Sequence, residues 1–351
     1  MLVGCYVDDI IFAHNSPKLL EWFIENLGGP DGFRAKHEGR LTYFLGVSIS
    51  QSDDFSVMAH QGSYIDKMIA RFIPTNEKSV VKHVMPCSPD SFQRLTTAST
   101  DEERDKMRRL PYLQLIGSLL YLQTMTRPDI SYHMSILCSL MHDPTPTAYY
   151  AAIDLLLYTS CTRDYHFHFP GSVKPPNGID PSLHACIRQS GGLVAYSDAS
   201  WRKPDRLGFS MFGFVVFLFG APISFTAKRL KVVAMSSAEA EYAAASYTCK
   251  EIAFIRGILS DLGFQIRHPT VLAVDNQAAI QISQNQGVTK LTKHFTDAVH
   301  YFRHQVEHLA VTPTFVRTHA QRADGFTKPL HKGLFRTWCS CLLHIAKNNM
   351  S

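Results

Sequence analysis

From residue 193 onward the chain alternates short apolar runs with helical patterns, and this alternation limits the fold more than any other feature. The apolar runs are rich in aromatic and β-branched residues, which is typical of strands. Between them, apolar residues recur every three or four positions, which is typical of helices. The pattern therefore predicts an α/β domain. The expected strands are Leu193–Trp201, Ser210–Phe219, Ile223–Phe225, Lys231–Met235, Val271–Asp275 and Thr314–Arg317, and the expected helices are Ser237–Leu262, a helix from Asn276, Thr296–Leu309 and Leu334–Leu343.

One uncharged segment, Gly208 to Ala227, is nearly long enough to span a membrane. Gly220-Ala221-Pro222 interrupts it and leaves two short β-prone runs. We therefore expect a buried hairpin and no membrane partner.

The first half of the chain has a different, mostly helical pattern. We expect helices over Pro17–Leu27, Tyr64–Phe72, Ser131–Met141 and Ala148–Thr159, an apolar segment over Tyr112–Leu122, a strand over Leu41–Ser50 and a polar loop over residues 74–106.

A stretch rich in glycine and proline, Tyr165–Ser190, separates the two halves. Such composition is typical of a linker. We therefore expect four parts: residues 1–60, residues 61–164, a linker over residues 165–190, and a domain over residues 191–345.

Near the start, Tyr6-Val7-Asp8-Asp9 lies between the apolar runs Met1–Val7 and Ile10–Ala13. Two β-prone runs joined by a pair of acids predict a hairpin with Asp8 and Asp9 at its tip. Adjacent carboxylates suit a two-metal site, because hard divalent ions prefer oxygen ligands. The structural alternative is that Asp pairs are ordinary turn residues.

Acidic residues recur in the second half at positions where a metal site would need them. Asp198 lies inside an apolar strand, where an unpaired charge is costly. Asp275 ends a strand before a helix, and Asp324 precedes another helix, so both have N-capping as an alternative role.

The helix that begins near Ser237 offers two glutamates. Ser236 and Glu239 have the spacing of a capping box, which gives Glu239 a structural role. Glu241 is two residues further, about 200° around the helix. We therefore expect Glu241 to be the ligand and keep Glu239 as the second choice.

Charge is unevenly distributed along the chain, whose formal net charge is +5. Residues 285–351 contain nine Lys or Arg and three acids, a balance of +6, so the rest sums to −1. This basic region fits contact with a phosphate backbone, or else a solvated surface. The eight cysteines follow no zinc or disulfide spacing, which favours a reducing compartment.

A series of short motifs follows one order along nearly the whole chain. They are Tyr6-Val7-Asp8-Asp9, Tyr43-Phe44-Leu45-Gly46, Gln61 to Phe72, Leu115 to Tyr121, Thr126 to Ile130, Tyr196-Ser197-Asp198-Ala199, Ala221 to Ser224 with Lys228, Ser236 to Tyr242, Asp275 to Ile280, Lys293-His294, and Ala323-Asp324 with Thr327 to Leu330. Each motif is weak alone, but the ordered series is specific. The chain resembles the C-terminal part of the Pol polyprotein of copia-type LTR retrotransposons.

The resemblance implies a partial reverse-transcriptase palm in residues 1–60, a thumb and connection in 61–164, and an RNase H-like mixed-sheet domain in 191–345. It implies that Asp8 and Asp9 are polymerase carboxylates, and that Phe44-Leu45-Gly46 belongs to the primer-gripping hairpin. The implied RNase H acids are Asp198, Glu241, Asp275 and Asp324, which would hold two Mg²⁺ or Mn²⁺ ions and cleave RNA in RNA–DNA hybrids.

Further expectations concern partners. The side chains expected at the nucleic-acid backbone are Lys293, His294, Arg317 and Lys328, with Lys290 and Lys332 as additional candidates. The resemblance also implies a primer–template, other Pol products such as integrase and protease, and a cytoplasmic, particle-associated or nuclear location.

The chain departs from the family pattern in several places. The fingers and the first part of the palm are missing, with the strand that carries a third polymerase carboxylate, so we expect no polymerisation by this chain alone. His319 stands where the family has an acid, Phe225 where it has Trp, and the linker is longer. The alternative function is a non-catalytic remnant or a nucleic-acid-binding module.

Two histidine patterns are weaker candidates for metal binding. His300, His304 and His308 recur every four residues and would share one helix face. His166-Phe167-His168 lies in a strand-like run. For the first pattern, the structural alternative is a surface helix.

Overall fold

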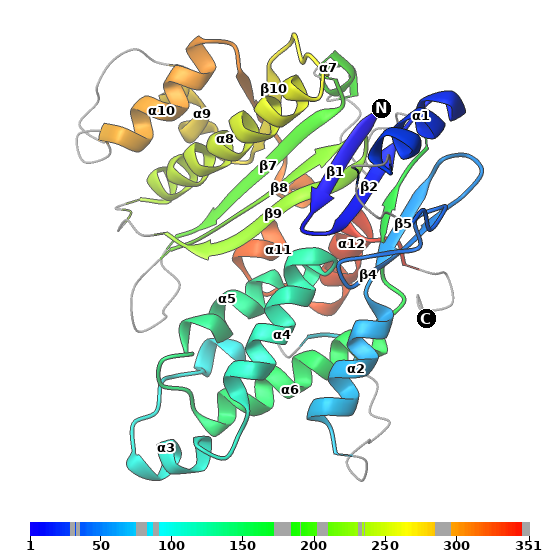
Figure 1. The fold of residues 1–351 in the computed structure, drawn as a ribbon. Helices are drawn as coiled ribbons and strands as arrows, with labels where there is room; N and C mark the ends of the chain where they lie inside the picture. Colours follow the sequence, from blue (N-terminus) through cyan, green and yellow to red (C-terminus); the bar gives the residue numbers. More distant parts are fainter. Residues whose placement is uncertain are drawn as a thin grey trace.

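The computed structural model describes residues 1–28, 32, 36–74, 83–86, 91–171, 184–189, 191–201, 210–230, 234, 236–284 and 296–345. Within these residues the strands form sheets of two, four and five strands. Helices lie on both faces of the largest sheet (Figure 1).

The five-stranded sheet consists of β7 (Leu193–Ser200), β8 (Met211–Leu218), β9 (Ala221–Arg229), β10 (Thr270–Val274) and β11 (Val311–Phe315), in the order β11-β10-β7-β8-β9. Strands β7, β8 and β9 are antiparallel neighbours, whereas β10 runs parallel to β7 and β11 parallel to β10. This is the RNase H-like mixed sheet that the resemblance implies. Pro313 is accommodated because β11 is an edge strand.

Side chains alternate between the two faces of this sheet and pack into two hydrophobic cores, one on each face. Leu193 and Ala195 pack into a cluster under helices α8 (Ser237–Asp261) and α10 (Thr296–Glu307). Helix α9 (Gln277–Gln284) lies on the same side (Figure 1). The alternate residues Val194 and Tyr196 face the opposite way and join the second cluster.

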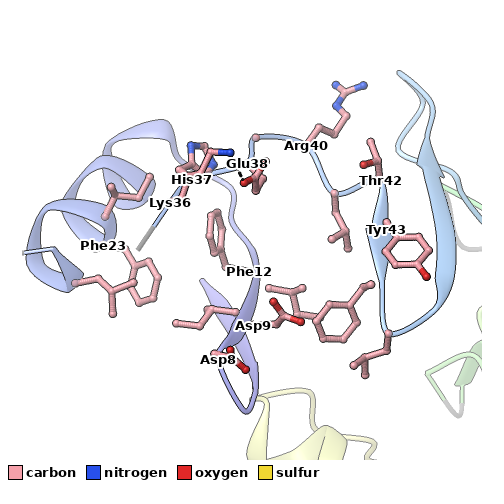
Figure 2. Close-up of a pocket in the computed structure, with 18 of the residues that line it drawn as sticks. Asp8, Asp9, Phe12, Phe23, Lys36, His37, Glu38, Arg40, Thr42 and Tyr43 are labelled. Atoms are coloured by element: carbon pink, nitrogen blue, oxygen red, sulfur yellow. Dashed lines mark ion pairs between the residues drawn. The ribbon is translucent and has the colours of Figure 1, made fainter. Parts of the chain in front are cut away.

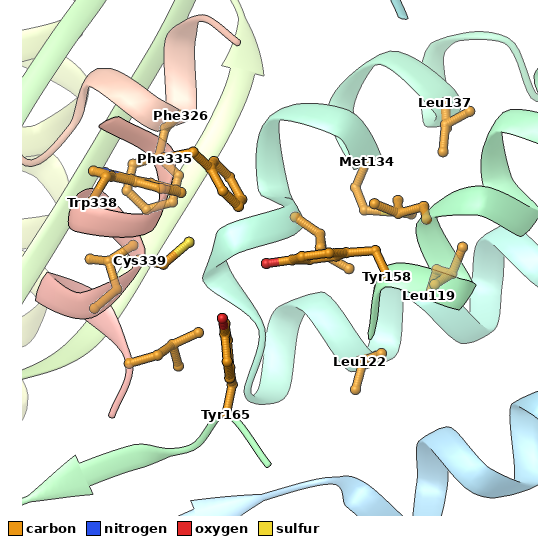
Figure 3. Packing of buried hydrophobic residues seen from close by; sticks show 14 of the residues in the cluster. Leu119, Leu122, Met134, Leu137, Tyr158, Tyr165, Phe326, Phe335, Trp338 and Cys339 are labelled. Carbon is orange, nitrogen blue, oxygen red and sulfur yellow. The ribbon is translucent and has the colours of Figure 1, made fainter. Parts of the chain in front are cut away.

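The second core joins the sheet to the helical first half of the chain. The part of this core farther from the sheet comes from helices α2 (Gly62–Phe72), α4 (Tyr112–Met125), α5 (Ser131–Ser139) and α6 (Pro146–Cys161). Helices α11 (Asp324–Thr327) and α12 (Lys332–Leu342) supply the part next to the sheet. Figure 3 shows Tyr158 and Tyr165 facing Phe335 and Cys339 across this junction. The two halves therefore share one core.

A buried ion pair lies at the junction. Arg127 and Asp129 flank Pro128 at the start of a 3-10 turn, and their side chains are 1% and 0% exposed. Arg127 donates to both carboxylate oxygens of Asp129, at 2.9 and 2.7 Å. Its other N–H groups reach the carbonyls of Thr159 and Thr162 and the Thr162 hydroxyl, while Tyr158 donates to Asp129 at 2.7 Å.

The N-terminal elements agree with the sequence except at one strand. Strands β1 (Leu2–Tyr6) and β2 (Asp9–Ala13) form the predicted hairpin, and α1 (Pro17–Leu27) follows. The single strand predicted over Leu41–Ser50 is wrong. Leu45 and Gly46 adopt positive φ and turn the chain between β3 (Tyr43–Phe44) and β4 (Val47–Gln51), so Phe44-Leu45-Gly46 lies on a hairpin.

Part of the predicted linker is regular structure. Residues 167–169 form β6 (Phe167–Phe169), which pairs with β5 (Val57–His60) as the last strand of the four-stranded sheet β3-β4-β5-β6. Residues 184–189 form α7 (His184–Gln189), and Ile187 belongs to the shared core. Residues 172–183 lie outside the described part of the chain. The division into four parts stays a prediction.

The loop predicted over residues 74–106 is also corrected, since it contains helix α3 (Asp101–Met107) and a short turn over Phe92–Arg94. Thr100 and Glu103 form a capping box at the start of α3. Arg104 pairs with Asp143 at 3.2 Å and anchors the helix.

The uncharged segment 208–227 contributes β8 and most of β9, as the hairpin prediction requires. Within the described residues, no helix has the length and apolar character needed to cross a membrane. The strand predicted over Lys231–Met235 falls mainly outside those residues, and Ala234 is not in a strand.

The buried ion pair gives a stability prediction. Asp129→Ala leaves the Arg127 guanidinium buried without its counter-charge, so we expect the free energy of unfolding to fall by about 3–5 kcal/mol. Glu102→Ala is the matched control, because it removes an exposed ion pair with Lys106, and such surface pairs contribute little to stability. Urea denaturation of both variants measures the difference, and equal losses would contradict the structural role.

Candidate metal centre

Strand β7 positions Asp198 near its carboxyl end, in the middle of the sheet. Asp198 is buried, with 4% of its surface exposed. The residue opposite it on the neighbouring strand β8 is Gly213. A Cβ atom at Gly213 would collide with Phe326 of α11, so the glycine allows α11 to lie against the sheet beside Asp198. From α11, the Thr327 hydroxyl donates to Oδ2 of Asp198.

Helix α8 carries Glu241 to the same place. Ser236 caps the helix, with its hydroxyl accepting from the Glu239 amide at 3.2 Å. Glu241 lies in the following turn, is buried, and its Oε2 atom has no hydrogen-bond partner. Glu239 is also buried but is not part of the acidic cluster.

Asp275 follows the last residue of β10. The capping alternative does not apply to it, because Asn276 accepts the Ala279 amide at 3.1 Å and caps α9 in its place. Strands β7 and β10 are parallel neighbours, so their carboxyl ends meet at one edge of the sheet, where α/β proteins place their ligands.

Asp198, Glu241 and Asp275 converge where the carboxyl ends of β7 and β10 meet. One carboxylate oxygen from each lies within 4.8 Å of the others, and among the described residues these three form the group able to hold a metal ion. Burial, then Asp198 and Asp275, raises the pKa of Glu241 well above its usual range. Burial and Asp198 also raise the pKa of Asp275, against the opposing effect of Lys328.

Asp324 begins α11 at the margin of this cluster. Burial and Asp198 raise its pKa to about 6, while Lys328 acts in the opposite direction. It does not act as a side-chain cap for α11, whose N-cap position is Ala323. Gln321 holds the preceding loop by donating to the Ser197 carbonyl at 2.9 Å. Thr327, Gly213 and Gln321 support the site. Thr327 belongs to one of the ordered motifs, but no spacing in the sequence reveals the supporting role of any of the three.

The residues expected at the nucleic-acid backbone differ in their position and in whether the structure describes them. Lys328 lies among the acids, with Nζ at 2.8 Å from Oδ1 of Asp324. Arg317 is exposed just beyond β11. Lys293 and His294, like Lys290, lie outside the described residues, whereas Lys332 is exposed at the start of α12.

Asp8 and Asp9 are exposed at the tip of the β1–β2 hairpin and are not part of the acidic cluster. They line a cleft of about 890 Å³ between this hairpin, α1 and the segment 36–46 (Figure 2). On the segment 36–46, Lys36 pairs with the nearby Glu38 at 2.8 Å. Lys36, His37 and Arg40 give the cleft basic groups that the sequence did not single out.

Of the helical histidine pattern, the structure describes only the side chains of His304 and His308, so the three-histidine site stays untested. The His304 and His308 rings stack on the outside of α10 with centroids 3.9 Å apart. The side chain of His300 lies outside the described part of the chain.

Comparisons with known proteins give relatives over nearly the whole chain, although no protein-family model matches it. The retrovirus-related Pol polyproteins from transposons RE1 and RE2 of Arabidopsis thaliana are each 33% identical over 95% of this chain. The Pol polyprotein from transposon TNT 1-94 of Nicotiana tabacum is 27% identical over 94%. The chain spans 21–23% of the length of these relatives.

Among solved structures, the chain is similar to ribonucleases H1. LC11-RNase H1, isolated from compost, matches 38% of this chain and 91% of its own at 15% identity and a TM-score of 0.31. RNase H1 from Halobacterium salinarum matches 38% and 93%, at 18% identity and a TM-score of 0.27. Since these scores are below 0.5, the fold assignment depends on the strand order of the five-stranded sheet. Over 95% of its length, the chain is therefore similar to a segment of the Pol polyproteins of copia-type retrotransposons.

Proposed function

We propose that residues 191–345 form a metal-dependent ribonuclease H that hydrolyses the RNA strand of RNA–DNA hybrids. The observation that carries this proposal is the convergence of Asp198, Glu241 and Asp275 at one edge of the sheet. Buried like charges destabilise a protein unless cations neutralise them, so such clusters are typical of functional sites. Neither helix capping nor ion pairing accounts for this group.

The donor set fits divalent magnesium or manganese. It consists of carboxylate oxygens, which these hard ions prefer, and the buried Oε2 of Glu241 lacks any other partner. Asp198, Glu241, Asp275 and Asp324 would hold two such ions. When bound, the ions supply an activated water molecule and stabilise the charge that develops on the scissile phosphate.

Residues around the acids have supporting roles in this proposal. Thr327 fixes the orientation of the Asp198 carboxylate by donating to Oδ2. Lys328 offsets part of the negative charge through its contact with Asp324. Arg317, and with it Lys293 and His294, would contact the hybrid backbone by charge neutralisation, which needs no base sequence.

The acidic hairpin at the start of the chain has a separate proposed role. Asp8 and Asp9 would belong to the polymerase palm, with a primer–template as ligand. Among the described residues they have no third acidic, histidine or cysteine ligand within reach. Association with other Pol products, in a cytoplasmic particle or the nucleus, is proposed from the family alone.

Cleavage of a hybrid tests the nuclease directly. With Mg²⁺, the wild-type chain should cleave the RNA of a labelled RNA–DNA hybrid, and Asp198→Asn should lower the rate at least about a hundredfold because it weakens metal binding. Asp261→Asn is the control, since Asp261 is exposed at the end of α8. If folded wild-type protein bound the hybrid without cleaving it, the chain would be a non-catalytic remnant.

The acidic cluster also predicts how stability depends on pH in metal-free protein. Because the pKa of Asp324 is raised from 3.8 to about 6, the folded state binds more protons than the unfolded state between these values. The contribution of this group to stability should therefore be highest below pH 3.8 and be lost as the pH rises through 6, by on the order of 3 kcal/mol. Denaturation in EDTA at several pH values, with Asp324→Asn for comparison, measures this slope. An unchanged slope in the variant would contradict the assignment.

A third prediction concerns polymerisation. Because Asp8 and Asp9 have no third ligand among the described residues, we expect no incorporation of nucleotides on a primed template by this chain alone. Primer extension with Mg²⁺ and all four nucleotides measures it, with Asp8→Asn as the control for contaminating polymerase. Extension that depends on Asp8 would show that the site is complete.

A further inference from the structure

Three histidines from two distant segments lie together on the four-stranded sheet, away from the acidic cluster. His166 and His168 are two residues apart at the start of β6, so their side chains share one face. His344 reaches them from beyond α12 through an isolated antiparallel bridge to His166. The bridge has two backbone hydrogen bonds, of 3.4 and 2.8 Å.

The imidazole rings are close neighbours. The ring centroids of His166 and His344 are 4.7 Å apart, and those of His168 and His344 are 5.8 Å apart. His166 and His168 alternate along extended backbone, and His344 lies opposite His166 in the isolated bridge, so the three side chains gather on one side of this segment. Imidazole nitrogens arranged in this way suit zinc and similar transition metals.

The hydrogen bonds of His166 prepare it to act as a ligand. Its Nδ1 lies 2.8 Å from the carbonyl oxygen of Asp164, which can only accept, so Nδ1 carries the proton. Nε2 is therefore the nitrogen with the lone pair, and it is buried without a hydrogen-bond partner. An N–H donated to a backbone carbonyl is the usual orientation of a metal-binding histidine.

Two further histidines, His344 and His60, differ in how well they suit a metal ion. Burial, and then His166 and His168, lowers the pKa of His344, which favours the neutral imidazole that metal binding requires. A fourth histidine, His60, is less suited. Its Nδ1 accepts from the Gly62 amide at 3.2 Å, which places its proton on Nε2.

We propose that His166, His168 and His344 bind a transition-metal ion such as Zn²⁺, with water completing the coordination. Among the described residues, only the acidic cluster has three ligand atoms within 4.8 Å of one another. The three histidine nitrogens therefore reach one ion only after the side chains of His168 and His344 change rotamer. Both side chains are exposed, so this change costs little free energy. The ion would join β6 to the segment that follows α12.

Isothermal titration of Zn²⁺ into EDTA-treated full-length chain tests the site. We expect one Zn²⁺ to bind in a background of Asp198→Asn with excess Mg²⁺, which keeps the acidic cluster from contributing. His168→Gln should weaken this binding at least about tenfold. Because His168 is exposed, this variant should fold, and His344→Gln provides a second, independent ligand removal.

The matched control is His304→Gln, which alters the exposed histidine pair on α10 and should leave Zn²⁺ affinity unchanged. Electron paramagnetic resonance of bound Cu²⁺ should show nitrogen splitting that is reduced in His344→Gln. Absence of binding, equal affinity in His168→Gln and wild type, or a loss of binding in the His304→Gln control would each overturn the proposal.

Discussion

The Arg127–Asp129 ion pair is the interaction that connects the helical half of the chain to the candidate site. Asp129 accepts from Tyr158 of α6, whose ring packs against Phe335 of α12 with centroids 6.0 Å apart. On the same helix, the Trp338 indole donates to the Arg322 carbonyl at 2.8 Å. Trp338 also packs so closely on Gly325 that no side chain would fit there. These contacts fix the start of α11, and hence Asp324, beside Asp198.

The chain contains two kinds of buried charge, and the contrast separates structure from function. Around Arg127 the hydrogen-bonding groups of both charges are satisfied, so the pair is compatible with a stable core. In the acidic cluster, by contrast, three carboxylates face one another, and Glu241 retains an unpartnered oxygen. A fold that keeps an unfavourable cluster in position is evidence for a ligand that compensates it.

The sequence predicted most elements of the fold, because their periodicity is strong and local. Helices α1, α8 and α12 and strands β7 and β10 lie within a few residues of their predicted bounds. The errors arose where local patterns depend on the backbone or on distant contacts. The turn at Leu45-Gly46 requires positive φ at both residues, and β6 is a strand because β5 lies beside it.

The residues of the candidate site could likewise be predicted only where the local sequence pattern reveals them. Asp198 could be recognised because a charge inside an apolar strand is unusual, and Glu241 because Glu239 already had the spacing of a capping box. The choice of Asn276 over Asp275 as the cap of α9 could not be read from sequence, since both residues are good caps. Nor could the contact between Gly213 and α11, which joins residues more than a hundred positions apart.

The shared core makes the two halves of the chain depend on each other for stability. The sheet face that carries Val194 and Tyr196 packs on α11 and α12, and these pack on α5 and α6. Phe225 stacks on Phe326 with centroids 6.3 Å apart and also contacts Phe167 of β6. Residues before and after the predicted linker therefore stabilise each other. If the acids form a nuclease, its geometry depends on the helical half as much as on the sheet, because that half supports the surface on which Asp324 and Lys328 are held.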